Sequence, residues 1–283
     1  MYFLQVISDQ VAFQEEILLG FIMVFGVFFG FLLWHFFKFR SGHFNNFWIW
    51  AVRIKPEYKK ILEHHFFYYN QLSIADKKKF EQRVQHFINI KQFIPRELDE
   101  VNDEMKTLVA ASAIQLTFGL PQVYLTHFKR ILIYPEDYFS TIHHRYHRGE
   151  VNLSGGIIVL AWKHFKEGYL DQDDSINLGL HELAHALRLE NTIFNQEYQF
   201  LDKTILKKWD QISTREMIKM KKDQNHLFRS YAAVNEHEFF AVAVENFFER
   251  PLEFYRRNQE MYEILARLLN QDTYRMYQTK EAK

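Results

Sequence analysis

The sequence predicts an α+β fold that is mainly helical, with a small β-sheet and one apolar helix ahead of the folded domain. Three observations indicate this class. Residues 17–37 form one long apolar run without a formally charged side chain. Many later stretches carry apolar residues at helical spacing. Only two stretches, residues 123–134 and 155–162, are rich in the β-branched and aromatic residues typical of strands.

The composition excludes several classes of function. With 283 residues, the chain can hold one sizeable domain and an appendage. Its 35 basic and 35 acidic residues give no formal net charge, so no overall basic character favours nucleic acid. The absence of cysteine excludes disulfides, thiolate metal sites and a cysteine nucleophile. Any zinc site must therefore use histidine and carboxylate ligands.

The N-terminal apolar run has the length of a transmembrane helix. Residues 17–37, at a rise of about 1.5 Å per residue, span about 31 Å, the thickness of a bilayer's hydrocarbon core. A secretory signal would need basic residues before the run and small residues after it. Asp9, Glu15 and Glu16 precede it instead, and bulky aromatic residues end it. We expect a transmembrane helix over residues 17–37, with residues 1–16 as a short extracytoplasmic tail.

The flanking charges predict the orientation of this helix. Lys38, Arg40 and Arg53 follow the run, and no lysine or arginine precedes it. The positive-inside rule then places the C-terminal side in the cytoplasm of a bacterial cell, with the protein crossing the cell membrane once. Residues 38–55, which include Trp48 and Trp50, are expected to form a juxtamembrane connector, and residues 56–283 a cytoplasmic domain.

The domain is expected to begin with helices. Ser73 and Asp76 form an S-x-x-D start signal, and Gly119 with Pro121 ends a later helical stretch. Helices are predicted over residues 57–69, 73–92, 100–118 and 236–249, and as one amphipathic helix from 252 to about 277. Residues 192–210 and 213–222 are expected to be peripheral and partly helical. The polar segment between the two strands is predicted to be a loop, with His143, His144 and His147 in solvent.

A metal-binding pattern lies within residues 176–188. His181, Glu182 and His185 form His-Glu-x-x-His in a stretch that is otherwise apolar. Side chains four apart on a helix share a face, about 5–6 Å apart at Cβ, so both imidazoles can bind one zinc ion at about 2.0–2.1 Å. Glu182 cannot easily join them, but it can take a proton from a water on the metal. Leaving these polar groups unpartnered in an apolar helix would be unfavourable.

A catalytic zinc needs a third protein ligand and an open position. The densest further group of carboxylates is Glu236, Glu238 and Glu245. Glu238 and Glu245 lie on one stripe of a predicted helix but two turns apart, about 10 Å along its axis. One zinc ion cannot easily bind both. One can bind the metal while the other orients a histidine ligand, and the spacing leaves open which does which.

These motifs resemble the Mlc titration factor A (MtfA) family of zinc peptidases. HELAH, followed some fifty residues later by YAAVNEHEFFAVAVENFFERP, carries the resemblance. The Y-x-x-x-N-x-x-E spacing is also similar to lethal-factor-like active sites. ILIYPEDYF and GGIIVLAW resemble segments that precede the family's HExxH helix. The resemblance covers roughly residues 56–260, excludes the apolar run, and implies a zincin-like metallopeptidase domain.

The resemblance implies a role for each site residue. Carried over by position, it implies that His181, His185 and Glu238 are the three zinc ligands. It also implies that Glu182 is the general base that activates zinc-bound water, and that the Tyr231 phenol hydrogen-bonds the oxyanion. Glu245 is left as a candidate for orienting a ligand. The implied activity is hydrolysis of peptide bonds, with a leaning toward aminopeptidase-like cleavage.

One position departs from the family pattern. MtfA proteins commonly continue the motif as HExAHxLD, with an acid three residues after the second histidine, where this chain has Arg188. We expect the zinc ligands to be unaffected, and the surroundings of the site and its substrate preference to differ. Residues 155–162 are expected to be the strand whose edge pairs with an extended peptide substrate.

Two other functions are compatible with the same residues. The resemblance implies that the domain could instead be a regulatory binding module that holds a transcriptional repressor at the membrane. A purely structural zinc site would normally have four protein ligands, whereas only three candidates are found.

Overall fold

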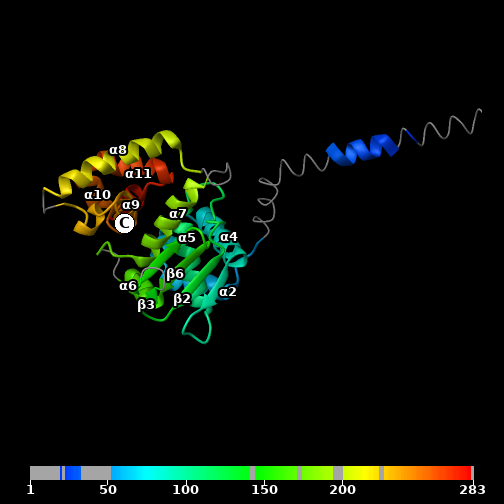
Figure 1. Ribbon diagram of the computed structural model, residues 1–283, viewed down its shortest axis with the longest axis horizontal. Helices are drawn as coiled ribbons and strands as arrows, with labels where there is room; N and C mark the ends of the chain where they lie inside the picture. Colours follow the sequence, from blue (N-terminus) through cyan, green and yellow to red (C-terminus); the bar gives the residue numbers. More distant parts are fainter. Residues whose placement is uncertain are drawn as a thin grey trace, which may run out of the picture. The chain divides into compact units, whose positions relative to one another are not determined.

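The computed structural model describes residues 20, 23–32, 52–140, 144–170, 174–193, 200–222 and 226–281 (Figure 1). The chain divides into two units, residues 1–51 and 52–283. In the first unit, residues 23–32 are helical. Across the described ranges, none of the helices combines the length and apolar character needed to cross a membrane. Residues 17–19, 21–22 and 33–37 of the apolar run lie outside those ranges, as do the tail 1–16 and the connector up to residue 51. The transmembrane helix therefore stays a prediction.

The second unit contains a small mixed sheet. Its strand order is β1-β2-β6-β5, with β1, β2 and β6 parallel and β5 antiparallel to β6. The strands are β1 (Gln92–Pro95), β2 (Arg130–Tyr134), β6 (Ile157–Ala161) and β5 (Gly149–Asn152). β6 is apolar and almost fully buried, as expected of an inner strand. A separate antiparallel hairpin pairs β3 (Tyr138–Ser140) with β4 (Arg145–His147).

The predicted loop between the two strand-like stretches is wrong, because it contains β3, β4 and β5. These strands have only three or four residues each and carry polar side chains, so they show little of the alternation that marks a half-buried strand. Their pairing partners, and not their own composition, hold them in the extended conformation.

Four helices precede or follow β1 and pack mainly against one another, while α5 also packs against α7 (Leu178–Thr192). They are α2 (Pro56–His65), α3 (Phe67–Gln71), α4 (Ile74–Ile90) and α5 (Asp103–Thr117). They confirm the predicted helical stretches, except that the first is divided at the buried residue Phe66. Ser73 caps α4 as its motif predicts, accepting a hydrogen bond from the Asp76 amide at 3.1 Å.

The second half of the unit is helical. Its elements are α6 (Trp162–Leu170), α7 (Leu178–Thr192), α8 (Lys203–Met220), the 3₁₀ turn η1 (Ser230–Ala233), α9 (Glu236–Glu249), α10 (Pro251–Arg257), α11 (Gln259–Leu269) and α12 (Thr273–Glu281). The single helix predicted from residue 252 to 277 is wrong. Asn258 caps α11, and Asn270 adopts a left-handed conformation (φ 51°) that ends it. The mainly helical α+β class with a small sheet is confirmed.

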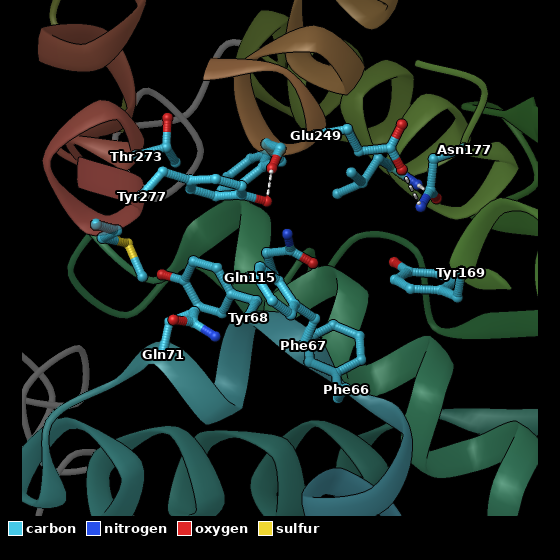
Figure 2. A pocket seen from close by; sticks show the side chains of 13 residues that line it. Phe66, Phe67, Tyr68, Gln71, Gln115, Tyr169, Asn177, Glu249, Thr273 and Tyr277 are labelled. Carbon is cyan, nitrogen blue, oxygen red and sulfur yellow. Dashed lines mark hydrogen bonds between the residues drawn. The ribbon is translucent and has the colours of Figure 1, made fainter. Parts of the chain in front are cut away.

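The C-terminal helices are tied to the N-terminal ones by polar contacts around a small cavity (Figure 2). Tyr68 donates to Gln271 at 2.7 Å, and Gln271 donates to the Gln115 carbonyl at 3.0 Å. Tyr277 donates to the Phe248 carbonyl at 2.9 Å. The cavity encloses about 30 Å³, room for about two waters. It is therefore too small for a substrate.

The helix α7 occupies the centre of the unit, between the sheet and the C-terminal helices (Figure 1). It packs against α5 and α9, and against β5 and β6. Asn177 caps its first turn by accepting from the Leu180 amide at 2.9 Å. A Cβ at Gly168 would lie 2.8 Å from the Asn177 Cα, so this glycine lets α6 approach the start of α7. The His-Glu-x-x-His pattern is thereby held against the sheet.

Candidate metal centre

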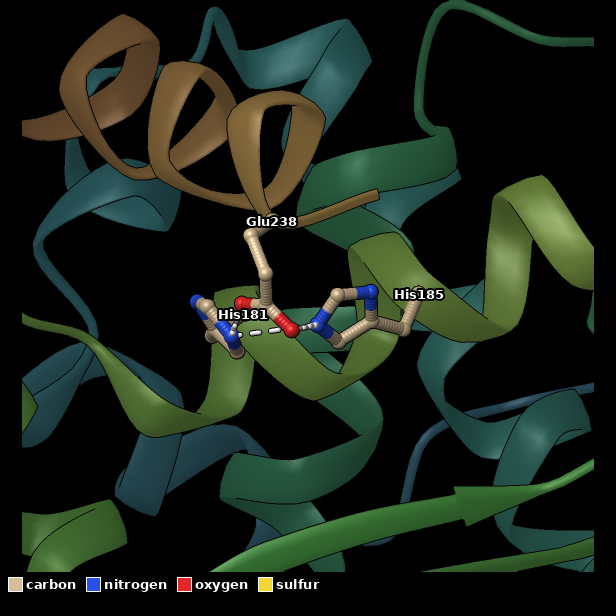
Figure 3. A group of neighbouring side chains, drawn as sticks. All are labelled: His181, His185 and Glu238. Atoms are coloured by element: carbon tan, nitrogen blue, oxygen red, sulfur yellow. Dashed lines mark hydrogen bonds and ion pairs between the residues drawn. The ribbon is translucent and has the colours of Figure 1, made fainter. Parts of the chain in front are cut away.

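Three side chains meet where α7 passes the first turn of α9 (Figure 3). His181 Nε2 lies 3.1 Å from Glu238 Oε2, and His185 Nε2 lies 3.5 Å from Glu238 Oε1. The two Nε2 atoms are 3.1 Å apart. One donor atom from each residue falls within 4.8 Å of the others, and no other such group of three occurs among the described residues. The structure thus brings together the two histidines and the third ligand that the resemblance implied.

The position of Glu238 follows from how α9 begins. Asn235 caps this helix, with its side chain accepting from the amides of His237 at 2.9 Å and Glu238 at 3.0 Å. The cap fixes the first turn, and the packing of α9 on α7 turns that end toward the two imidazoles. Glu245 lies two turns further on and is not part of the group of three donor atoms, so the geometry favours Glu238 as the third ligand.

The donor set fits a divalent metal ion such as zinc. Two imidazole nitrogens and a carboxylate are three of the ligands zinc prefers, and three protein ligands leave a position open. Glu238 Oε2 is buried and accepts no well-oriented hydrogen bond from the described residues. A buried carboxylate oxygen without such a donor favours a cation in its place.

The electrostatics of the cluster point the same way. Burial by itself would lower the pKa of His181, but the carboxylates of Glu238 and Glu245 raise it to about 10. Burial opposes ionisation of Glu238, yet His181 and His185 hold its pKa well below the usual range. A site that attracts a proton this strongly to an imidazole nitrogen also favours a metal cation at that nitrogen.

Glu245 orients His181 from behind. Its Oε1 lies 2.6 Å from His181 Nδ1, which leaves Nε2 facing the cluster. The carboxylate is fully buried and also accepts from the Asn177 amide at 3.0 Å. Despite this burial, His181 and Arg229 hold the pKa of Glu245 below its ordinary value. Its contacts are those expected of a residue that fixes a ligand's tautomer.

Arg229 is a site residue that sequence reasoning missed. Its guanidinium donates to both oxygens of Glu245, at 2.8 and 2.9 Å, and to the Ser175 carbonyl. Arg229 also precedes η1, so the same side chain that neutralises Glu245 anchors the turn carrying Tyr231. A single arginine in a polar stretch has no pattern of its own, and only its closeness to Tyr231 in the sequence could have drawn attention to it.

Glu182 lies beside the cluster without belonging to it. Its side chain is buried between α7 and β5, against Gly149. Burial raises the pKa of Glu182, while His181 and His185 oppose the rise. A carboxyl group whose proton affinity is raised in this way suits proton transfer better than an ordinary glutamate does.

Tyr231 stands at the mouth of the site. It is 49% exposed, and its ring centroid lies 6.2 Å from that of His181. Burial of the phenol and the nearby Glu238 raise the pKa of Tyr231 to about 12. The phenol is therefore protonated at neutral pH and available as a hydrogen-bond donor.

A cleft of about 650 Å³ opens onto these residues. Its lining includes Arg145, His147 and Arg148 of the β4–β5 segment, and the acidic residues Glu167 and Asp174. His181, Glu182 and Tyr231 also line the cleft. Its size and its charged lining suit a short stretch of peptide better than a small uncharged molecule.

Arg188 does not take part in the cleft. Its guanidinium lies 3.0 Å from Asp210 on α8 and 5.3 Å from the centroid of the Phe240 ring. The residue at the family's acidic position thus links α7 to α8 and α9. It does not line the cleft, so the departure affects the support of the helix.

A first prediction tests the role of Glu245. Glu245→Gln keeps the shape but removes the charge that faces His181 Nδ1, so we expect metal affinity to fall about 10–100-fold. Competition with a coloured chelator measures it. Glu260→Gln, at an exposed carboxylate paired with Arg215, is the matched control. Equal affinities in both variants would show that Glu245 does not support the ligand.

Comparisons with known proteins agree with the geometry. The model of the glucose-regulated metallo-peptidase M90 family matches residues 43–269. The chain is 26% identical to the uncharacterized protein slr2042 of Synechocystis sp., over 76% of this chain and 83% of that one. It is 25% identical to Mlc titration factor A of Escherichia coli O7:K1 and of an Enterobacter species, over 71% of this chain and 81% of each relative. The resemblance inferred from the motifs is confirmed, and the chain belongs to the glucose-regulated metallo-peptidase M90 family.

Proposed function

We propose that this protein is a zinc-dependent peptidase that hydrolyses peptide bonds in the cleft beside α7. The observation that carries the proposal is the convergence of His181, His185 and Glu238 beside a cleft that His181 and Glu182 line. A peptide-library digest with the full-length protein, with and without a chelator, tests it. We expect cleavage that the chelator abolishes and added zinc restores. Cleavage that survives complete metal removal would contradict the proposal.

Each residue of the site has its own role in the proposed hydrolysis. His181, His185 and Glu238 would hold the zinc ion, which when bound would supply a Lewis acid for the scissile carbonyl and lower the pKa of water. Glu182 takes the proton of the attacking water and then delivers it to the departing amine nitrogen. The Tyr231 phenol donates a hydrogen bond to the carbonyl oxygen as that oxygen gains negative charge.

The strand that would pair with the substrate is β5. The sequence-based assignment of residues 155–162 to this role is wrong, because β6 pairs with β2 on one side and β5 on the other. β5 is one of the two edge strands of the sheet, and it is the one that packs against α7. An extended peptide could add to this edge through backbone hydrogen bonds, which would bring its carbonyls close to Glu182.

The surroundings of the cleft predict a preference for bulky apolar side chains. Three of the large apolar side chains exposed in the described part of residues 52–283 line the cleft: Tyr146, Ile176 and Tyr231. Tyr146 is 72% exposed, lines the cleft and packs against Phe139 at 5.6 Å between ring centroids. We expect peptides with an aromatic or large aliphatic residue near the scissile bond to be cleaved about tenfold faster than their alanine counterparts.

The test compares kcat/KM for paired peptides in two variants. Tyr146→Ser is expected to reduce the preference severalfold. Ile74→Ser removes an even more exposed apolar side chain, on α4 and not part of the cleft lining, so it is expected to leave the preference unchanged. A preference that stays intact in Tyr146→Ser would place the apolar subsite elsewhere.

The location of the protein is a separate part of the proposal. We propose that residues 17–37 anchor it in the cell membrane with the peptidase domain in the cytoplasm. The apolar run and the basic residues after it support this arrangement. Reporter fusions to both termini test it. A reporter that is active only in the cytoplasm should be active at the C-terminus and inactive at the N-terminus. The opposite result would reverse the orientation.

A second candidate function is that of a regulatory binding module. Two of the relatives bear the name Mlc titration factor A, which describes titration of Mlc. By analogy, the domain could hold a transcriptional repressor at the membrane. A pull-down with the Glu182→Gln variant distinguishes the functions: one folded regulator would favour binding, whereas trapped peptides or unfolded proteins would favour proteolysis.

A further inference from the structure

Gly149 lies against Glu182, the residue proposed above to transfer the proton. A Cβ added at residue 149 would lie 2.4 Å from Glu182 Oε1, 2.5 Å from its Cγ and 2.6 Å from its Cδ. Contacts of a Cβ below 3.0 Å are essentially never found, so something would have to move. Among the described glycines only Gly156 has a positive φ. Residue 149 therefore requires glycine for space and not for backbone conformation.

The backbones on both sides of this contact are fixed. Gly149 pairs with Leu160 in the β5–β6 ladder, and the Ala161 amide donates to the Arg148 carbonyl at 2.7 Å. The next residue along β5, Glu150, accepts from Ser140 at 2.8 Å, which ties the strand to β3. Glu182 itself lies mid-helix in α7. Neither strand nor helix can easily yield, so an added side chain would displace the Glu182 carboxylate.

The position of the Glu182 carboxylate depends on packing. The other acidic groups of the site are held by polar partners, Glu245 by Arg229 and Asn177, and Glu238 by the two imidazoles. Within the described part of the chain, no hydrogen bond or ion pair reaches the Glu182 carboxylate. Its side chain is only 6% exposed, so the surface of β5 limits where it can stand.

We propose that Gly149 is a positioning residue for Glu182, and that the missing side chain at residue 149 keeps this carboxylate beside the cluster of His181, His185 and Glu238. The catalytic part of this proposal rests on the function proposed above. The steric part does not, because it concerns two residues of the folded chain whatever the reaction.

Unfolding experiments test the steric part. In the full-length protein, Gly149→Ala is expected to raise the unfolding equilibrium constant about tenfold or more, because overpacking of a fixed site is unfavourable. In a Glu182→Ala background the same change should matter less than about threefold, since the methyl group then has room. A double-mutant cycle from urea unfolding measures this coupling. Additive effects would overturn the proposal.

Kinetics test the catalytic part. Gly149→Ala is expected to lower kcat about 100-fold, with KM within about threefold and the bound metal unchanged by elemental analysis. Adding Glu182→Asp, whose carboxylate is drawn back by one methylene, should recover at least about tenfold of that loss. Gly155→Ala is the matched control, because its Cβ would meet only the flexible end of Ile157 at 3.1 Å and the Asn152 side chain at 3.2 Å.

The outcomes separate the two proposals. A Gly149→Ala protein with unchanged kcat, or one in which only KM rises, would overturn the positioning role. Loss of activity without any recovery by Glu182→Asp would do the same. If the wild-type protein cleaves no peptide while the unfolding cycle shows strong coupling, Gly149 still places Glu182 and it is the proposed peptidase function that fails.

Discussion

Glu182→Gln is expected to abolish peptide hydrolysis while leaving the metal in place. Glutamine has nearly the shape of glutamate but cannot accept the proton of the attacking water. General-base catalysis is typically worth about 10²–10⁴-fold, so kcat should fall by at least that order. Metal content should not change, because the three donors that converge are His181, His185 and Glu238.

The measurement pairs single-turnover hydrolysis with elemental analysis of the same preparation. Glu236→Gln is the matched control, because this carboxylate is exposed at the start of α9. It should keep both metal and activity. A Glu182→Gln protein that hydrolyses peptides at the wild-type rate would remove Glu182 from the mechanism, and the cluster alone would then have to account for catalysis.

His185→Ala is expected to empty the site. Only His181 and Glu238 of the three donors remain after this change, and two donors bind a metal ion more weakly than three. The loss of affinity should exceed the 10–100-fold typical of changing an outer partner such as Glu245. Metal measured after dialysis against a mild chelator should fall from about one ion per chain to nearly none.

A second readout does not depend on metal analysis. A ligand that binds only the folded state raises its stability, so the wild-type Tm should fall when a chelator is added. The Tm of His185→Ala should not respond. His237→Ala changes an exposed histidine on the same turn of α9 as Glu238 and serves as control. Full retention of metal by His185→Ala would contradict the ligand set.

The site was more predictable than the strands around it. Four-residue spacing on a helix dictates that His181 and His185 share a face, whatever surrounds them. The choice between Glu238 and Glu245 was not available from spacing, because spacing gives the distance along one helix and not which turn faces another. The packing of α9 on α7 brings Glu238 to the two imidazoles, and that packing is a tertiary property.

The features that the sequence did not predict depend on contacts and caps that apolar spacing does not reveal. β4 and β5 are short and polar, and pairing with a neighbour holds them extended. The apolar spacing of residues 252–277 continues through Asn258 and Asn270 and so predicts continuous helix, whereas capping and a left-handed residue break the helix at these two positions. The role of Arg229 does not follow from sequence spacing, because its partner Glu245 is 16 residues away on another element.

The open edge of β5 has a consequence for the behaviour of the protein in concentrated solution. An edge that accepts a peptide would equally accept the same strand of another molecule, which is how sheets aggregate. Here the strand has only four residues, and Arg148 and Glu150 place charges beside and within it. The short length and the charges of β5 therefore oppose self-association. Lengthening or neutralising this strand should make the protein prone to precipitation.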